Sequence, residues 1–402
     1  MTDWQLISSQ DDFHDAVQSL ANGTGVIGVD AERASGYKYA QSAYLIQFYR
    51  EAAGTYLFDP IGIESFAELQ DSLSDVEWVF HAASQDLPCL REVGLNPETI
   101  FDTELAARLL GLPRVGLGAV VEELLGVHLA KEHSAVDWST RPLPDPWLNY
   151  AASDVTLLPD LREILAQQLA ESGKTEYAHE EFLDVLERKP KLAPEEPWRR
   201  MSGIHHISGL RNLAVARELW LARDELARST DVSPGRLIPD AALVAASQEM
   251  PRSKGQLAAL KTFHGRASRR ELDRWWEAII RGRETEDLPI LKPHNSNTMP
   301  PHRTWKNRFP EAYERLTLAR NALTVRAEDI AIPLENLMTP EILRRICWHP
   351  PTEITAENIS LTLHELGARP WQIKETGQII TDVFIDIIQN PSSHNEETSL
   401  EE

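Results

Sequence analysis

The sequence predicts a mixed α/β domain followed by two all-α modules, and three observations lead to this fold class. Short apolar segments alternate with helix-like patterns between residues 26 and 125, as in a sheet flanked by helices. From about Asp154 onward the pattern is almost wholly helical. Two proline-rich breaks then divide the helical part. The chain therefore begins with a sheet-containing domain and continues in helices alone.

Four apolar runs predict the strands of the first domain, at residues 26–29, 44–48, 55–58 and 76–81. The first run ends at Asp30, and the third precedes a turn at Asp59 and Pro60. Helical spacing follows at residues 65–73, 87–93, 103–110 and 117–125. A further helix runs from Val155 through the 160s, and another spans the region of Glu180.

Helix ends are indicated by two polar residues. Ser84 is predicted to cap the helix at 87–93, with Pro88 tolerated in its first turn. Asp102 is predicted to cap the helix at 103–110.

The proline-rich breaks set the domain boundaries. Three prolines within residues 189–197 indicate an interdomain linker, and four more lie between residues 287 and 301. We therefore expect a first domain at 1–188, a linker at 189–204, a helical module at 205–288, a linker at 289–303, a second helical module at 304–390 and a flexible tail at 391–402. The two modules are similar in length and could be a diverged duplication.

Charge is distributed unevenly along the chain. The net charge of −22 combines −20 for residues 1–190, −1 for residues 191–198, +7 for residues 199–283 and −8 for residues 284–402. A basic module beside an acidic domain indicates a polyanion-binding segment, although an Arg-rich solvated surface is an equal alternative. Four arginines could form a phosphate-facing stripe or a solvated helix face: Arg266, Arg269, Arg270 and Arg274.

Composition excludes several protein classes. Hydrophobic residues make up 42% and charged residues 25%, which argues against a mainly disordered chain. No apolar run approaches the roughly 20 residues of a membrane span, and no secretory signal is expected. Cys89 and Cys347 are the two cysteines, so a disulfide framework and a thiolate zinc site are excluded. This usage fits a reducing cytoplasm.

Carboxylates carry the chemical signal of the first domain. Asp30 and Glu32 are two residues apart at a strand end, so both can face one cation. Tyr150 and Asp154 lie one helical turn apart, and Asp86 projects from a strand-to-helix junction. Carboxylates placed together repel unless cations neutralise them, and oxygen ligands favour Mg²⁺ or Mn²⁺. Each pair alone is more often a surface feature, and the signal lies in their order along the chain.

Six motifs in this order resemble the DEDDy branch of the DnaQ-like 3′→5′ exonucleases, and most closely the ribonuclease D family. They lie at residues 28–32, 44–47, 80–86, 101–103, 137–143 and 150–154, and the resemblance covers about residues 4–170. It implies a ribonuclease H-like mixed sheet flanked by helices. It also implies four metal-binding carboxylates, at Asp30, Glu32, Asp86 and Asp154, with Tyr150 positioning the attacking water.

The helical modules extend the resemblance. Residues 219–240 are similar to the HRDC domain, a small nucleic-acid-binding module that accompanies ribonuclease D, and residues 304–390 resemble a second, more divergent copy. The family implies two divalent ions, Mg²⁺ or Mn²⁺, and release of nucleoside 5′-monophosphates from RNA 3′ ends, with transfer RNA precursors as substrates. No membrane and no obligate protein partner is expected. Alternatives are a DNA 3′→5′ exonuclease acting on single strands in repair, and a non-catalytic nucleic-acid-binding adaptor.

Three further residues are candidate substrate contacts. His81 could face the substrate or be hydrogen-bonded locally, Gln47 could reach a nucleotide or link strands, and Arg141 could contact a phosphate. Ala31 and Arg33 stand where many relatives carry Thr and an apolar residue. Because that neighbourhood touches the terminal nucleotide in the family, end recognition is expected to differ in detail.

Overall fold

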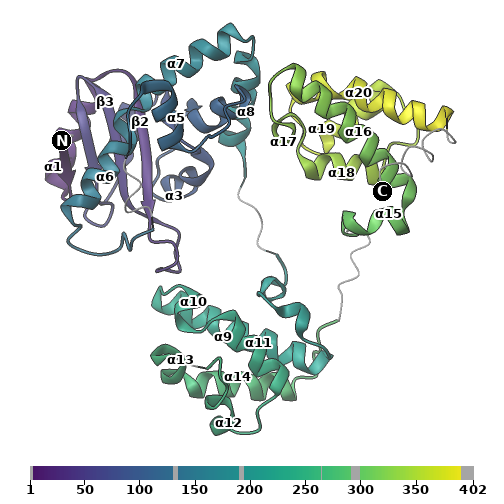
Figure 1. Ribbon diagram of the computed structural model, residues 1–402. Helices are drawn as coiled ribbons and strands as arrows, with labels where there is room; N and C mark the ends of the chain where they lie inside the picture. Colours follow the sequence, from purple (N-terminus) through teal and green to yellow (C-terminus); the bar gives the residue numbers. More distant parts are fainter. Residues whose placement is uncertain (1–2, 130–134, 190–193, 264, 291–298, 391–402) are drawn as a thin grey trace.

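The computed structural model describes residues 3–129, 135–189, 194–263, 265–290 and 299–390. The tail expected at 391–402 lies outside the described residues. Figure 1 shows a sheet-containing nuclease-like domain and two separate helical domains, in the predicted order.

Within the described residues, six strands form one mixed sheet in the order β1-β4-β3-β2-β5-β6. Their bounds are β1 Trp4–Ile7, β2 Thr24–Arg33, β3 Ala43–Glu51, β4 Gly54–Phe58, β5 Trp78–Phe80 and β6 Ile100–Asp102. Pairing of β2 with β3 and of β3 with β4 is antiparallel, and the other three pairs are parallel. The mixed sheet is confirmed, and β1 and β6 were not predicted.

The central strand β2 is longer than predicted. It continues past Asp30 because Glu32 pairs with Leu45 and Arg33 pairs with Ala43 of β3. The apolar run 26–29 therefore marks only part of the strand, because the strand continues through the polar residues Asp30, Glu32 and Arg33.

Eight helices surround the sheet in the described part of this domain: α1 Gln10–Ala21, α2 Ala67–Ser72, α3 Leu87–Glu92, α4 Thr103–Leu109, α5 Leu117–Leu125, α6 Asp145–Thr156, α7 Leu158–Glu171 and α8 Thr175–Glu187. The helix expected from Val155 is two helices, and the first begins at Asp145. A proline and an acidic residue in its first turn favour that start.

Helix α6 packs on β2, β3 and β4 through small and apolar side chains. Gly28 permits the close approach, because a Cβ there would lie 2.5 Å from the carbonyl oxygen of Val155. Beneath the helix, Leu45 and Leu57 of the sheet meet Leu148 and Ala151 in one buried cluster. This packing fixes the height of α6 above the sheet.

The first helical domain contains η2 Pro197–Arg200, η3 Ile204–His206, α9 Leu210–Thr230, α10 Pro234–Leu237, α11 Asp240–Glu249, α12 Lys254–Ala258, α13 Arg266–Arg270 and α14 Leu272–Glu284. Trp198 and Met201 pack in its core. These residues fall in the expected linker 189–204, so the domain begins earlier than the proline pattern indicated.

The second helical domain contains η4 His302–Thr304, α15 Trp305–Arg308, α16 Pro310–Asp329, α17 Leu334–Leu337, α18 Pro340–Trp348, α19 Ala356–Glu365 and α20 Pro370–Gln389. Its long α16 ends like α9. Asp231 and Ala331 both have left-handed backbones, with φ of 47° and 48°. After each, an N–H (Val232 or Ile332) bonds back to the carbonyl five residues earlier. The same spacing closes α4 and α7, where the Leu112 and Lys174 N–H groups bond to the carbonyls of Ala107 and Leu169, so the diverged duplication stays a prediction.

The second helical domain docks on the nuclease-like domain through α8 and α20. Trp371 stacks on Tyr177 with ring centroids 4.7 Å apart, and its indole N–H donates to Glu181 over 2.9 Å. Arg369 donates to the same carboxylate over 2.6 Å. The apolar core of the nuclease-like domain continues across this contact, because Trp371 belongs to it.

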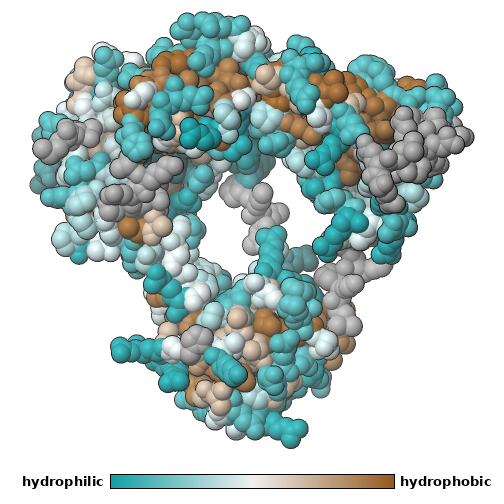
Figure 2. All heavy atoms as spheres, viewed as in Figure 1, coloured by the Kyte–Doolittle hydropathy of each residue, from teal (hydrophilic) through white to brown (hydrophobic). Residues whose placement is uncertain are grey.

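The first helical domain docks on residues 34–42, the connection between β2 and β3. Asp231 accepts hydrogen bonds from the Ala40 N–H (3.0 Å) and the Tyr44 hydroxyl (3.4 Å). The Arg236 guanidinium lies 3.8 Å from the centroid of the Tyr37 ring. Figure 2 shows an open passage between the three domains. None of the described helices is both long and apolar enough to cross a lipid bilayer.

Candidate active site

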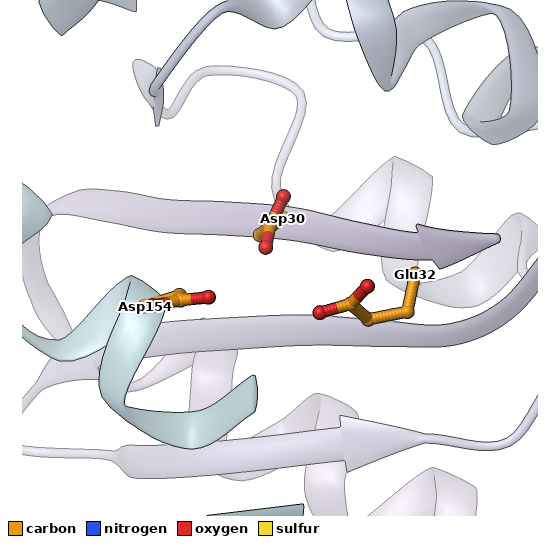
Figure 3. A group of neighbouring side chains, drawn as sticks. All are labelled: Asp30, Glu32 and Asp154. Carbon is orange, nitrogen blue, oxygen red and sulfur yellow. The ribbon is translucent and has the colours of Figure 1, made fainter. Parts of the chain in front are cut away.

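Three carboxylates from two elements converge at the centre of the nuclease-like domain. Asp30 and Glu32 project from β2, and Asp154 projects from the last turns of α6 (Figure 3). One carboxylate oxygen of each lies within 4.8 Å of those of the other two. The two-residue spacing on a strand therefore places Asp30 and Glu32 on one face, as predicted, and α6 brings Asp154 to them.

Asp86 reaches the same cavity from a turn after β5. The turn depends on Ala82, which has a left-handed backbone with φ of 68°, and on the short 3-10 helix η1 Ala83–Gln85. Asp86 lines the cavity with Asp30 and Glu32, although it is not in the compact group of three. Its charge interacts with that of Asp30.

Buried Asp102 holds that turn in place. Its carboxylate accepts from the N–H groups of Ala82 (3.1 Å) and Ala83 (2.9 Å), and also from Glu104 and Leu105 at the start of α4. The predicted cap of α4 is confirmed, and the carboxylate also supports the Asp86 turn. The cap predicted at Ser84 is wrong, because Ser84 lies inside η1 and Asp86 occupies the N-cap position of α3 without a side-chain bond. Pro88 does lie in the first turn of α3.

Tyr150 lies one turn before Asp154 on α6 and lines the cavity. Its hydroxyl is electrostatically coupled to the Asp154 carboxylate. Burial and the charges of Asp154 and Glu32 raise the pKa of Tyr150, so the phenol is neutral at physiological pH. A neutral phenol can donate one hydrogen bond and accept another beside the carboxylates.

The cluster is electrostatically unfavourable without a cation. Burial raises the pKa of Asp30 to about 6, and burial with the Asp30 charge raises the pKa of Asp154 to about 8. The pKa values of Glu32 and Asp86 are also raised well above normal by burial and by neighbouring carboxylates. Arg33 partly opposes this effect. A bound cation would reverse the balance by favouring the ionised forms.

The cavity has a volume of about 440 Å³. Several lining residues were not predicted, among them Ser35, Gln85, Glu104, Gly116 and Val136. They come from loops and helix starts far apart in the chain, so no local pattern could have indicated them.

His81 lines the cavity, and its Nδ1 lies 2.9 Å from the Thr103 hydroxyl. Burial lowers its pKa to about 4, so the imidazole is neutral at physiological pH. His81 therefore combines the two alternatives considered from the sequence, because it is hydrogen-bonded locally and also lies on the cavity wall.

The other candidate contacts lie away from the cavity wall. Gln47 is fully buried beneath α6. Arg141 uses all five N–H donors within the protein, with two to Asp59 and three to the carbonyls of Trp138, Thr140 and Tyr44. Because these donors are engaged, the structure favours a structural clamp over the phosphate contact considered for Arg141.

The arginines of the basic module are mostly open to solvent. Arg266, Arg269 and Arg270 on α13 are exposed. Arg274 on α14 is half-buried and pairs with Glu271 and Glu225. Three of the four therefore have the exposure that a phosphate contact needs.

Each of the three domains matches a known protein family. A family described as 3′-5′ exonuclease matches residues 4–170, the HRDC domain matches residues 212–279, and a 3′ to 5′ exonuclease C-terminal domain matches residues 298–384. Ribonuclease D of Bartonella henselae is 29% identical over 301 residues, covering 72% of this chain and 73% of that protein. Ribonuclease D of Escherichia coli is 30% identical over 277 residues, covering 65% of this chain and 72% of that protein. The chain belongs to the ribonuclease D family.

Solved structures agree with membership of the ribonuclease D family. A protein from Bifidobacterium adolescentis has a TM-score of 0.86 and 33% identity, over 96% of this chain and 100% of that one. Escherichia coli ribonuclease D has a TM-score of 0.68 and 25% identity, over 90% and 98%. As a member of this family, the chain is a 3′→5′ exoribonuclease, and its exonuclease domain implies dependence on divalent metal.

Proposed function

We propose that this protein removes nucleotides one at a time from RNA 3′ ends and releases nucleoside 5′-monophosphates. The observation that carries the proposal is the convergence of Asp30, Glu32 and Asp154, with Tyr150 one helical turn before Asp154 on the wall of the same cavity. Hydrolysis that leaves the phosphate on the departing nucleotide needs a positioned water and stabilisation of the leaving 3′ oxygen. This geometry supports both requirements.

The side chains fit two hard divalent ions, Mg²⁺ or Mn²⁺. All the candidate ligands are carboxylates, whose oxygens such ions prefer, and their raised pKa values indicate a site that a cation would stabilise. Asp30, Glu32 and Asp154 would hold one ion, and Asp86 and Asp30 would hold the second ion. When bound, such a pair supplies an activated water and neutralises charge on the leaving oxygen.

The residues of this chain would position what the ions activate. The neutral Tyr150 hydroxyl, one helical turn from Asp154, would orient the attacking water by accepting or donating a hydrogen bond. His81 on the cavity wall would offer a neutral donor or acceptor to the terminal nucleotide. The position of both side chains on the cavity wall and the protonation of each group support these roles.

RNA would be held mainly outside the acidic domain. Residues 199–283 carry a net charge of +7, and the exposed Arg266, Arg269 and Arg270 would contact phosphates. We propose transfer RNA and other stable RNA precursors as substrates, because the Escherichia coli relative is described as an exoribonuclease involved in structured RNA processing. The proposal includes a cytoplasmic location, which the sparse use of cysteine favours.

Digestion of 5′-end-labelled RNA with Mg²⁺, Mn²⁺ or EDTA tests the proposal. We expect a ladder that shortens from the 3′ end, 5′-monophosphates among the products, and no activity in EDTA. Asp154→Asn should lower the rate at least about 100-fold. Asp160→Asn, which changes an exposed carboxylate on the neighbouring helix, is the matched control and should act like wild type.

A parallel assay on DNA of the same sequence separates the sugar preferences. Equal or faster degradation of DNA would overturn the RNA assignment, and 3′-monophosphate products would overturn the proposed chemistry. Activity in purified Asp154→Asn equal to wild type would show that a contaminant was responsible.

A further inference from the structure

Gln47 is a buried amide without a hydrogen-bond partner. It lies on β3 with no exposed surface. Within the described residues, neither its Oε1 nor its Nε2 has a hydrogen-bond partner. A buried side-chain amide usually has at least one partner, because losing water without replacement is unfavourable. This exception therefore calls for a physical explanation.

Packing alone does not explain the amide. Leu45 lies two residues before it on the same face of β3, and Leu57 lies opposite it on β4. Both leucines belong to the apolar cluster beneath α6. An apolar side chain of similar length would suit these neighbours better, so the polar group needs another partner.

The partner is indicated by strand register. Gln47 pairs directly with Asp30 across β2 and β3. Directly opposed residues of antiparallel strands project from the same face with Cβ atoms about 4.5–5.5 Å apart. Gln47 therefore lies directly beside Asp30 on the same face of the sheet, and it is not among the residues that line the cavity.

We propose that Gln47 is a positioning residue for the metal cluster, whose amide N–H donates a hydrogen bond to the Asp30 carboxylate when the metal is bound. The inference rests on the metal-dependent function proposed above. An ionised carboxylate accepts hydrogen bonds only, and one neighbouring donor fixes which oxygen faces the cation. A neutral amide does this without a positive charge that would compete with the ion.

Two glutamine variants distinguish this role from a structural one. Manganese binding to the full chain is measured by calorimetry, and thermal unfolding is measured in EDTA and in Mn²⁺. Gln47→Met keeps the length and removes the donor. We expect Mn²⁺ affinity about 10–100-fold weaker, as for other groups that orient metal ligands. Because an unpaired amide is removed, the unfolding temperature in EDTA should stay the same or rise.

Gln372→Met is the matched control. Gln372 is equally buried, but its amide donates to the Asn336 carbonyl over 2.7 Å and accepts from the Arg369 N–H over 3.1 Å. Its loss should lower the unfolding temperature in EDTA and leave Mn²⁺ affinity unchanged. Each variant is thus expected to impair one measurement only: Gln47→Met weakens Mn²⁺ binding, and Gln372→Met lowers the unfolding temperature.

Activity adds a third measurement. At low Mn²⁺ the Gln47→Met rate should fall, and raising Mn²⁺ should restore kcat with an unchanged KM for RNA. A residue that contacts RNA would instead show a raised KM that metal does not rescue. Gln47→Leu, a second apolar variant, should behave in the same way. It keeps the test valid if the methionine variant misfolds.

The outcomes separate this inference from the proposed function. Unchanged Mn²⁺ affinity in both Gln47 variants, with wild type binding normally, would overturn the positioning role alone. Wild-type protein that binds no Mn²⁺ would overturn the metal-dependent function itself. Asp154→Asn should lose binding in the same titration, which shows that the signal comes from the cluster.

Discussion

Substituting Gly28 with alanine tests how the approach of α6 to the sheet sets the active site. Gly28 lies on β2, two residues before Asp30 and on the same face. An added Cβ would lie 2.5 Å from the Val155 carbonyl oxygen and 3.2 Å from the Leu158 Cβ. Ordinary contact begins at 3.4 Å, so the α6–α7 junction would have to move by about 0.9 Å. Asp154 precedes Val155 and would move with it.

Both stability and rate should respond to Gly28→Ala. Overpacking of this kind costs about 1–3 kcal/mol, which lowers the unfolding temperature by roughly 2–4 °C per kcal/mol in a domain of this size. A displacement of about 1 Å in a reacting group can cost about 100-fold in rate. We therefore expect a loss of single-turnover rate far larger than partial unfolding could explain.

Single-turnover digestion of end-labelled RNA at saturating metal measures the rate, and urea unfolding measures the stability. Gly255→Ala is the control, because Gly255 is exposed on α12 and an added Cβ would make only an ordinary contact. It should be neutral or slightly stabilising. A Gly28→Ala protein that is folded, destabilised as expected and within threefold of the wild-type rate would refute the link between helix height and catalysis.

Four other perturbations have defined outcomes. Asp102→Ala leaves four backbone N–H groups without their acceptor, so we expect the free energy of unfolding in urea to fall by about 3 kcal/mol and metal binding to weaken. Unchanged stability would contradict the role of Asp102 in holding the turn. Arg141→Lys should lower the free energy of unfolding by about 2 kcal/mol with little change in kcat. A large rise in KM for RNA would instead support the phosphate contact considered from the sequence. Because the folded pKa values of Asp30 (about 6) and Asp154 (about 8) exceed their unfolded value of 3.8, metal-free stability should fall as pH rises from about 4 to about 8. Metal affinity should rise over the same window with release of protons, which calorimetry in two buffers measures; pH-independent affinity would contradict the raised pKa values. Asp231→Ala should detach the first helical domain from residues 34–42, which small-angle scattering would record as a larger radius of gyration, and an unchanged radius would show that the other contacts suffice.

Short-range patterns were sufficient wherever a single element decides the outcome. The two-residue repeat of a strand places Asp30 and Glu32 on one face, and the helical turn places Tyr150 beside Asp154. The cap at Asp102 is equally local, because the N–H groups of Glu104 and Leu105 follow it directly. These features depend on backbone geometry within a few residues, which the sequence displays directly.

Long-range contacts required the tertiary structure. Arg141 meets Asp59, a residue 82 positions away, and that contact decides that its guanidinium is a clamp. The left-handed backbone of Ala82 has no sequence signal, because alanine rarely adopts it, and it is held by Asp102 from a neighbouring strand.

The sequence by itself therefore determined the order of the domains, the mixed sheet and the spacing of the acidic ligands. Only the tertiary structure decided which polar groups remain available to a ligand, because a donor such as Arg141 can be satisfied by distant partners and an amide such as Gln47 can be left unsatisfied beside the cluster. The physical reason is that secondary structure repeats over short distances, whereas the balance of buried hydrogen bonds depends on the whole packed domain.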